Sequence, residues 1–512
     1  MNRRERRREK KLRKLPSGSK VFNRALEDKI KIANAYHERG YLWDAVTRYR
    51  EIVNLDDDVA VVHSNMGAAL AGLGEFDKAA EALVRALQID PVYSDAMINL
   101  GTVRFHQENF SEAIDWFEKA LDFNLQSFQL YNNLGNAKAR TGKPQEAEDN
   151  YRKALSIDPN SAEVLHNLGC VCHERMNLSE AECYFRKAIS ISPSFAKAHW
   201  NLANTLLMAG KFEEGWEEFV WRWKCDDFRG TVPVDKVREW KGEPLEGKTI
   251  LVRTEQGHGD AIQFVRFLAN LKRRGAIVFL LCPSELAKLL ETEGSADEVN
   301  YIPKFSSQAD FQTTLMELPR ILGLKAEEFM VQFPYLRVPT GNSIQFVKDE
   351  RISIGLVWRG RSTHLNDKNR SIGLESIRPL IDRQDVRFIS LQLPPINQEI
   401  LKAGFNGQIE EIGSKLKDFT ATAAVISDLD LVLSVDTAVA HLAGAQGKKV
   451  WVLLPYCPDW RWLEHGSRSI WYPEMRLFRQ SKLGEWGEVI SQVKFALHRF
   501  IAEKADKALL EK

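Results

Sequence analysis

The first part of the chain carries the apolar spacing of amphipathic helices, and this pattern recurs every 34 residues. The recurrence is marked by Asn65-Met66-Gly67, Asn99-Leu100-Gly101, Asn133-Leu134-Gly135, Asn167-Leu168-Gly169 and Asn201-Leu202-Ala203. Each unit then has a small residue followed four positions later by a bulky one: Ala79 and Leu83, Ala113 and Phe117, Ala147 and Tyr151, Ala181 and Phe185, Gly215 and Phe219. Small residues let two helices approach closely, so each unit predicts a helix pair around a buried bulky side chain.

Proline follows the second helix of several units, at Pro91, Pro159 and Pro193, where it cannot continue a helix. In these positions the segment resembles the tetratricopeptide repeat, with units starting near residues 26, 60, 94, 128, 162 and 196. The resemblance implies an α-solenoid over residues 26–225 whose concave groove binds a protein. Asparagines such as Asn99, Asn133 and Asn167 either line this groove or hold contacts between helices. The terminal units diverge, with Ala33 for the first glycine and Arg222 for the late alanine, because one face lacks a neighbour.

The 34-residue period stops at residues 226–248, where glycine, proline and aspartate predict a connector. Beyond it, strands are predicted at 249–252, 276–281 and 299–302, with helices at 261–273 and 284–291. A second series has strands at 352–358, 386–391, 431–435 and 450–454, with helices at 374–381, 419–426, 438–445 and near 485–503. This alternation is typical of parallel sheets covered by helices. It predicts two Rossmann-like lobes, residues 249–340 and 341–512.

Ligands of open parallel sheets bind beyond the carboxyl ends of the strands, so the loop 255–260 after the first strand is a candidate site segment. Its glycines let the backbone approach a substrate, which makes Gln256, Gly257 and Gly259 an expected acceptor loop. Asp260 is expected to begin the following helix, whose dipole stabilises an ionised carboxylate suited to a general base. The alternative is a helix N-cap without chemistry, and spacing alone favours it because Asp is among the commonest N-caps.

Two further loops are candidates for binding an anionic donor. The polar loop after the strand at 352–358 contains Trp358, Arg359, His364, Asn366, Arg370 and Ser371. Its arginines match phosphate oxygens, although a solvated charged loop is the alternative. The junction after the strand at 431–435 contains Asp436, Thr437, Ala438 and His441. Free backbone N–H groups at this helix start form an anion site, and His441 either joins the site or packs beneath it.

Together these loops, with Trp358-x-Gly360, Asn366-Asp367, Arg370-Ser371 and Asp436-Thr437 before His441-Leu442-Ala443-Gly444, resemble the bacterial tetratricopeptide-repeat glycosyltransferases. Their catalytic lobes are similar to the lipopolysaccharide heptosyltransferases. The resemblance implies a GT-B domain with Asp260 as the catalytic base and Asp436-Thr437 beside the donor diphosphate. It implies a metal-independent inverting displacement in which Thr437 and Arg370 stabilise the departing nucleoside diphosphate. His258 departs from the apolar residue expected beside the catalytic position.

A metal site is not expected. Asp428-Leu429-Asp430 superficially matches a metal-binding Asp-x-Asp motif, but it directly precedes a strand and is interpreted as a turn. The six cysteines show no Cys-x-x-Cys spacing, and Cys170 and Cys172 would point to different faces of one helix, so reduced thiols are expected. No cofactor is expected either, because the nucleotide-sugar is a substrate.

Charged residues make up 28% of the chain and apolar residues 44%, which is typical of a soluble protein. No apolar run approaches the roughly 20 residues of a membrane span. Residues 1–25 are predicted to be a disordered basic tail, since residues 1–14 hold nine Arg or Lys. No apolar segment follows these charges, so a cytoplasmic location is expected. The alternative for the tail is weak contact with an anionic membrane surface, and nucleic acid is not an expected partner.

The leading hypothesis is a glycosyltransferase that moves a sugar from a nucleotide-sugar to a protein or glycan acceptor. In this hypothesis the repeat groove recruits the acceptor. The alternative, from another class, is a non-catalytic tetratricopeptide scaffold whose transferase-like lobe only senses sugar nucleotide. Repeats alone argue for an interaction arm, so the chemistry depends on Asp260 and the Asp436-Thr437 junction.

Overall fold

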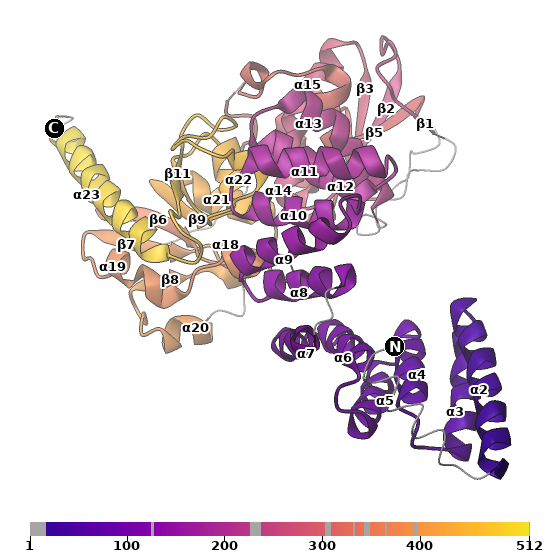
Figure 1. Ribbon diagram of the computed structural model, residues 1–512. Coiled ribbons are helices and arrows are strands. Elements are labelled where there is room, and N and C mark those ends of the chain that lie inside the picture. Colours follow the sequence, from indigo (N-terminus) through magenta and orange to yellow (C-terminus); the bar gives the residue numbers. More distant parts are fainter. Residues whose placement is uncertain are drawn as a thin grey trace. The chain divides into compact units, whose positions relative to one another are not determined.

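The computed structural model of the chain describes residues 17–123, 127–225, 237–302, 309–330, 333–341, 349–363, 366–393 and 397–510. Its contacts divide the chain into two units, Met1–Cys172 with Ser190–Ser192, and His173–Ile189 with Pro193–Lys512. The first unit holds most of the repeat helices (Figure 1). The second holds the last repeat helices and two parallel sheets. No helix in the described ranges combines the length and the hydropathy needed to cross a bilayer.

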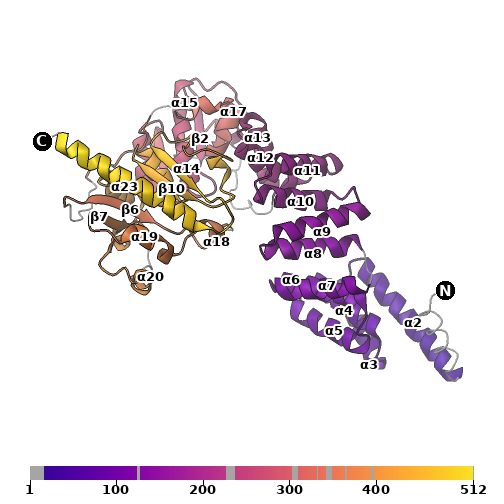
Figure 2. The same cartoon turned by 60° about the vertical axis from the view of Figure 1, so that its left-hand side comes forward.

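The first unit consists of helices that pair as the 34-residue period predicts (Figure 2). They are α2 (Ser17–Glu38), α3 (Leu42–Leu55), α4 (Ala60–Gly72), α5 (Phe76–Ile89), α6 (Ser94–His106), α7 (Phe110–Asp122), α8 (Phe128–Arg140), α9 (Pro144–Ile157) and α10 (Ala162–Glu174). Helix α2 begins at Ser17, within the range 1–25 that the sequence predicts to be a tail. The first helix therefore extends further toward the N-terminus than the repeat motif does.

Close packing inside several pairs depends on the glycine of the first helix. A Cβ added to Gly101 would lie 2.6 Å from Cε1 of Phe117, and one added to Gly135 would lie 2.6 Å from Cε1 of Tyr151. Real Cβ atoms do not approach other atoms so closely, so only glycine fits. Phe117 is fully buried, which confirms that the bulky residues of the repeat form its core.

Replacing Gly101 by valine is expected to lower the free energy of unfolding by about 1–3 kcal/mol, because the added side chain overpacks the Phe117 site. Urea unfolding followed by circular dichroism measures this change. The matched control is Gly74→Ala, since nothing lies within 4 Å of a Cβ there, although its positive φ of 78° costs some strain. Equal stability of Gly101→Val and the natural chain would contradict this packing.

Asparagine side chains link neighbouring repeats. Asn65 Nδ2 donates to Asn34 Oδ1 at 2.9 Å, and Asn133 Nδ2 donates to Thr102 Oγ1 at 3.3 Å. Asn167 Nδ2 donates to Oδ1 of Asn132 and of Asn136, at 3.2 and 3.1 Å. The interpretation of Asn133 and Asn167 as inter-helix contacts is thus confirmed. Asn99 is half-buried on α6, and both of its interpretations stay open.

The second unit opens with the last helices of the repeat series. They are α11 (Leu178–Ile191), α12 (Ala196–Met208), α13 (Phe212–Phe219) and the 3₁₀ helix η1 (Val220–Lys224). We call α12, α13 and η1 the terminal repeat. Its 3₁₀ helix η1 contains Arg222, which replaces the repeat's late alanine and is fully buried.

The first lobe is built on a five-stranded parallel sheet in the order β1-β5-β2-β3-β4. Its strands are β1 (Arg238–Glu239), β2 (Thr249–Arg253), β3 (Ile277–Leu281), β4 (Glu298–Asn300) and β5 (Phe311–Thr314). Its longer helices are α14 (His258–Phe264), α15 (Leu268–Arg273), α16 (Ser284–Leu290) and α17 (Leu318–Leu322), with a 3₁₀ turn η3 (Val265–Phe267) between α14 and α15. Strand β1 lies within the predicted connector 226–248, so the lobe begins earlier than its apolar pattern suggests.

The second lobe is built on a six-stranded parallel sheet in the order β11-β10-β9-β6-β7-β8. Its strands are β6 (Ile352–Val357), β7 (Val386–Ser390), β8 (Ile409–Glu411), β9 (Leu431–Val435), β10 (Val450–Leu454) and β11 (Met475–Arg479). Its helices include α18 (Asp367–Arg370), α19 (Arg378–Ile381), α20 (Asn397–Lys402), α21 (Phe419–Ser427), α22 (Ala438–Ala445), η10 (Trp460–Trp462) and α23 (Trp486–Leu510). The apolar face of α23 packs with β6 and β9 in one core (Figure 2).

The terminal repeat shares a hydrophobic core with both lobes. Trp216 of α13 meets Phe264 of the first lobe with ring centroids 6.0 Å apart, and Trp460 of the second lobe at 5.3 Å. Trp216 and Trp460 are both buried. The second unit is therefore a single packed body of repeat and lobes, and the loops after β2, β6 and β9 lie within it.

Candidate functional site

Asp260 lies in the first turn of α14, and Gly257 is the N-cap of that helix. The sequence places Asp260 at the helix start, but the helix begins at His258. The reason is that Asp260 Oδ2 accepts the Gly257 backbone N–H at 2.7 Å, which satisfies a donor that the helix start leaves free. Asp260 is thus a capping residue, though not the N-cap itself, and this bond uses only one of its two carboxylate oxygens.

The other oxygen of Asp260, Oδ1, forms an ion pair with Arg461 Nη2 of η10. Arg461 is buried and also donates to Asp459 Oδ1 at 2.7 Å and to Gln263 Oε1 at 2.9 Å. Burial raises the pKa of Asp260, while the Arg461 charge and the Gly257 N–H oppose that shift. The result is a carboxylate held in one orientation, with a pKa above its ordinary value, which suits a base that acts near neutral pH.

The Asp436-Thr437 junction connects β9 to α22, and Thr437 is the N-cap of that helix. Thr437 Oγ1 lies 3.0 Å from Ser434 Oγ, and Arg370 Nη1 donates to the Asp436 carbonyl at 3.2 Å. Burial raises the pKa of Asp436 to about 6. A guanidinium and the first N–H groups of α22 therefore lie at the same junction, which is the arrangement expected of an anion site.

His441 is buried one turn into α22. Its Nδ1 lies 2.9 Å from the Tyr472 hydroxyl, and its ring stacks on Trp462 with centroids 5.2 Å apart. Burial lowers the pKa of His441 well below its ordinary value, so the ring is neutral at pH 7. These contacts agree with the interpretation that His441 packs beneath the junction.

Gly259 brings the two junctions together. A Cβ on Gly259 would lie 3.0 Å from His441 Cδ2 and 3.6 Å from Ala438 Cα. The absence of a side chain at Gly259 therefore lets α14 approach the start of α22. As a result Asp260, the next residue, lies beside the Asp436-Thr437 junction, and Arg461 experiences the charges of both Asp260 and Asp436.

The loop after β6 is only partly available to a ligand. The Trp358 ring is buried, and its Nε1 donates to Glu399 Oε1 at 2.8 Å, so this predicted donor-binding side chain belongs to the core. Arg359 forms an ion pair with Glu399 at 3.3 Å. Arg370 is turned toward Gly360 and the Asp436 carbonyl.

Two further predicted residues of this loop stabilise its conformation. Asn366 is the N-cap of α18 and accepts a hydrogen bond from Asn369, while Ser371 Oγ accepts the Gly360 N–H at 3.0 Å. His364, also predicted to bind the donor, lies outside the described residues.

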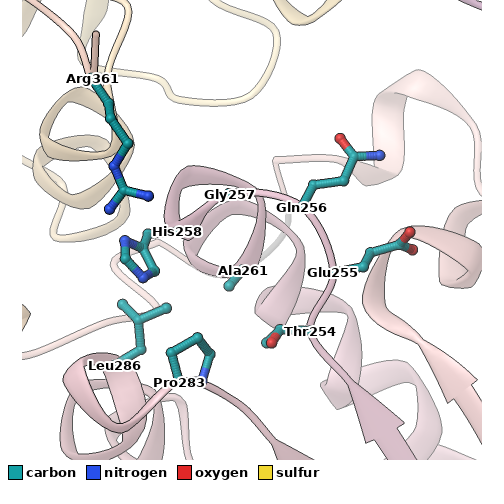
Figure 3. A pocket seen from close by; sticks show the side chains of 9 residues that line it. All are labelled: Thr254, Glu255, Gln256, Gly257, His258, Ala261, Pro283, Leu286 and Arg361. Atoms are coloured by element: carbon teal, nitrogen blue, oxygen red, sulfur yellow. The ribbon is translucent and has the colours of Figure 1, made fainter. Parts of the chain in front are cut away.

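A pocket of about 310 Å³, part of it open solvent, lies on the His258 side of α14 (Figure 3). It is lined by Thr254, Glu255, Gln256, Gly257, His258, Ala261, Pro283, Leu286 and Arg361. Figure 3 shows the Arg361 guanidinium and the His258 ring directed toward one another, above the apolar side chains of Pro283 and Leu286. Two residues of the predicted acceptor loop, Gln256 and Gly257, line this pocket, whereas Gly259 faces α22.

His258 lies close to residues of both lobes. Its Nε2 is 4.0 Å from Glu285 Oε1, and its ring packs edge-on against Phe419 of α21 with centroids 5.1 Å apart. Burial lowers the pKa of His258, an effect that Glu285 opposes. The histidine two residues before Asp260 therefore contributes a neutral ring to the pocket wall.

The described residues contain no cluster of three or more His, Cys, Asp or Glu side chains arranged to hold a metal. The Asp428-Leu429-Asp430 segment forms a turn, since Asp430 Oδ2 accepts the Ser353 N–H at 2.9 Å and Asp430 Oδ1 bonds to Lys504 at 2.7 Å. Cys170 is half-buried and Cys172 is buried, and neither forms a disulfide with another described residue.

Sequence reasoning missed the two arginines that hold the site loops. Arg461 belongs to the Pro458-Asp459-Trp460-Arg461-Trp462 segment, whose position after the strand β10 is the signal that could have identified it. Arg222 was visible only as a departure from the repeat pattern. A charged residue where a buried alanine is expected needs a buried partner, and that partner is Glu255.

Comparison with known proteins identifies the repeats. A tetratricopeptide repeat family model matches residues 58–126 and 126–194. Protein FlbA of Caulobacter vibrioides is 25% identical over 337 residues, which cover 59% of this chain and 54% of FlbA, so the chain spans about half the length of that relative. Small glutamine-rich tetratricopeptide repeat-containing protein 2 of Saccharomyces cerevisiae is 31% identical over 78 residues, 15% of this chain and 22% of that protein.

Among solved structures, YrrB, described as a TPR protein with an unusual peptide-binding site, is 22% identical with a TM-score of 0.31. The match covers 35% of this chain and 93% of YrrB. The family model shows that the N-terminal region of this chain contains tetratricopeptide repeats, a type of protein-interaction scaffold, and parallel α/β sheets follow this region.

Proposed function

We propose that this protein is a glycosyltransferase that moves a sugar from a nucleotide-sugar to a protein or glycan acceptor. The two lobes are interpreted as a GT-B domain, with the donor on the second lobe and the acceptor on the first. The observation that carries the proposal is the meeting of Asp260 with the Asp436-Thr437 junction, which the bare backbone of Gly259 makes possible. A base and an anion site side by side are what a displacement at an anomeric carbon requires.

In the proposed reaction, Asp260 removes the proton from the acceptor hydroxyl as its oxygen attacks the anomeric carbon. The bond from that carbon to the donor phosphate breaks on the opposite face, and the nucleoside diphosphate leaves. In this proposal the N–H groups that open α22 and the Arg370 guanidinium, which donates to the Asp436 carbonyl, stabilise the negative charge of the leaving group. A single displacement inverts the anomeric configuration.

The proposed acceptor site is the pocket beside Gln256 and Gly257. Gly257 joins the pocket to the base, because its atoms line the pocket while its N–H donates to Asp260. Apolar side chains on one side and the polar groups of His258 and Arg361 on the other suit a hydroxyl-bearing acceptor.

Replacing Arg361 by glutamine is expected to raise KM for the acceptor about tenfold and to leave KM for the donor unchanged, as loss of one charged hydrogen bond would do. Initial rates at varied acceptor and donor concentrations separate the two constants. Arg468→Gln, at an exposed arginine outside the pocket, is the matched control. An increase in KM for the donor alone would mean that Arg361 binds the donor and not the acceptor.

The first unit is the proposed recruiting arm. A truncated chain of residues 173–512 is expected to release nucleoside diphosphate slowly from the donor yet to lose transfer to a macromolecular acceptor. Truncation to residues 226–512 is expected to prevent folding, because it removes Trp216 and Arg222 from the shared core. Size-exclusion chromatography and donor hydrolysis assays test both chains. Undiminished macromolecular transfer by residues 173–512 would contradict recruitment by the first unit.

The activity itself is tested by incubating the full chain with a panel of nucleotide-sugars and measuring release of nucleoside diphosphate. The proposal predicts release from one donor class, at a rate that rises when the acceptor is added. If no donor is consumed although one binds, the sensing scaffold is the better description.

A further inference from the structure

The ion pair between Asp260 and Arg461 joins two loops that belong to different lobes. Asp260 follows β2 of the first lobe, and Arg461 follows β10 of the second. Each loop also contacts the last part of the repeat series, between Arg175 and Lys224, so this part of the chain supports both partners of the pair. The Asp260 loop is held by an ion pair, whereas the Arg461 loop is held by hydrogen bonds and aromatic packing.

On the first-lobe side, the support is a fully buried ion pair. Arg222 of η1 donates from Nε to Glu255 Oε2 at 3.0 Å and from Nη2 to Glu255 Oε1 at 2.8 Å. Its Nη2 also lies 2.7 Å from Glu317 Oε1, and its Nη1 donates to the Phe219 carbonyl at 2.9 Å. A guanidinium bonded in this bidentate way fixes both the position and the plane of the carboxylate.

Glu255 is the first residue of the loop that leads to Asp260. The next residue, Gln256, has a φ of 59°, a left-handed conformation that a residue other than glycine rarely adopts. The loop then returns through the Gly257 N–H to the Asp260 carboxylate. Because Glu255 is fixed at one end and Asp260 at the other, the groups that hold Glu255, the bidentate Arg222 and the Thr314 hydroxyl, determine where this strained turn lies.

On the second-lobe side, the support consists of hydrogen bonds from both ends of the loop around Arg461. The Tyr456 hydroxyl donates to the Arg175 carbonyl at 3.2 Å, and the Glu464 N–H donates to the Met208 carbonyl at 3.0 Å. Between these ends, Trp460 packs against Trp216 and Phe219 of α13. The loop that carries Arg461 is thus hydrogen-bonded to the repeat series both before and after the arginine.

We propose that the end of the repeat series is a positioning element of the transfer site. Arg222 sets the Asp260 loop, and the Arg175 and Met208 carbonyls together with Trp216 set the Arg461 loop. This inference rests on the proposed function for its catalytic consequence. It also implies that the last helices of the repeat series hold the site together and are not a detachable recruiting arm.

Backbone hydrogen exchange of the full chain tests the positioning without requiring turnover. Arg222→Lys keeps the charge but loses the bidentate contact, so the Gly257, Asp260 and Ala261 amides are expected to exchange about tenfold faster. Arg186→Lys is the matched control, since Arg186 forms an exposed ion pair with Glu182 and Glu214. In this variant the same three amides should exchange as fast as in the natural chain. Unchanged exchange in Arg222→Lys would overturn the proposal.

If Arg222→Lys does not fold, Tyr456→Phe supplies a milder test, because it removes only the hydroxyl bonded to Arg175. Faster exchange of the Arg461 amide is then expected, and exchange equal to that of the natural chain would overturn the proposal on this side.

Kinetics of Arg222→Met/Glu255→Leu distinguish positioning from simple stability. Replacing both members of a buried ion pair by apolar side chains of similar size is often neutral for stability. Glu317 loses Arg222 in this variant but keeps its ion pair with Arg320 at 2.9 Å, so the chain is expected to fold with a lowered melting temperature. Measured below that temperature, kcat is expected to be lowered about tenfold, with donor KM unchanged. A kcat equal to that of the natural chain would refute positioning. Absence of turnover in the natural chain would refute the proposed function instead. The hydrogen-exchange experiment would still decide whether Arg222 positions the Asp260 loop.

Discussion

Replacing Asp260 by asparagine is expected to lower kcat by about 10²–10⁴, the usual contribution of a general base. Asparagine keeps an oxygen that can accept the Gly257 N–H, so the start of α14 should be preserved. Donor binding should not change, because the proposed donor contacts lie on the second lobe. Steady-state kinetics with isothermal titration of the donor measures the two effects separately.

The matched control for this substitution is Asp418→Asn. Asp418 is also a helix-capping aspartate, since its carboxylate accepts the Ala421 N–H of α21 at 2.7 Å, but it has no place in the proposed chemistry. Equal activity of Asp260→Asn and the natural chain would reduce Asp260 to a structural cap. Equal loss in both variants would indicate a general effect on folding.

Replacing Arg461 by methionine is expected to have the largest effect on stability, about 3–5 kcal/mol, because it leaves the largely buried Asp260 carboxylate and the half-buried Asp459 carboxylate without their buried cation. It should also change the pH dependence. Arg461 opposes the rise in the pKa of Asp260 that burial causes, so its loss raises that pKa further. Since the base acts when deprotonated, the acid limb of the kcat profile should move to higher pH.

Urea unfolding and a pH–rate profile measure the two consequences of Arg461→Met. In Asp260→Asn/Arg461→Met, part of the stability should return, because one of the unpaired charges is gone, while activity stays low. A kcat profile of Arg461→Met that moved to lower pH, or did not move, would mean that Asp260 is not the group that titrates.

The elements nearest the site were predictable from the sequence because their apolar runs are continuous. Strand β9 and helix α22 have the bounds 431–435 and 438–445 that the sequence predicts, since every residue of β9 is buried between neighbouring parallel strands. The repeat helices followed equally well from small and bulky residues at fixed spacing. At these positions the residues that the sequence pattern marks as apolar are also the residues that the fold buries.

The elements that were missed depend on contacts distant in sequence. Strand β5 contains Gln312 and Thr314, which are polar yet buried, because Gln312 Nε2 donates to the Val237 carbonyl and Thr314 Oγ1 to Glu255. Strand β8 ends in Glu410 and Glu411 at the edge of its sheet. No apolar run marks such strands. They become visible only when the partner segments are in place.

The same limit applies to the site. Asp260 could be named because a carboxylate follows a glycine turn, but its partner Arg461 is 201 residues away in the chain. The core position of Trp358 was not predictable either, because it depends on Glu399, a residue of α20 that accepts its indole N–H. Sequence patterns thus identified the loops but not which side chains of those loops face a ligand.

The configuration of the newly formed glycosidic bond tests the central claim most directly. Proton NMR of the complete reaction, with the consumed donor and its acceptor, records the anomeric coupling before and after transfer. The account predicts one product whose configuration is opposite to that of the donor. A product of retained configuration, or a donor that stays intact beside a competent acceptor, would contradict it.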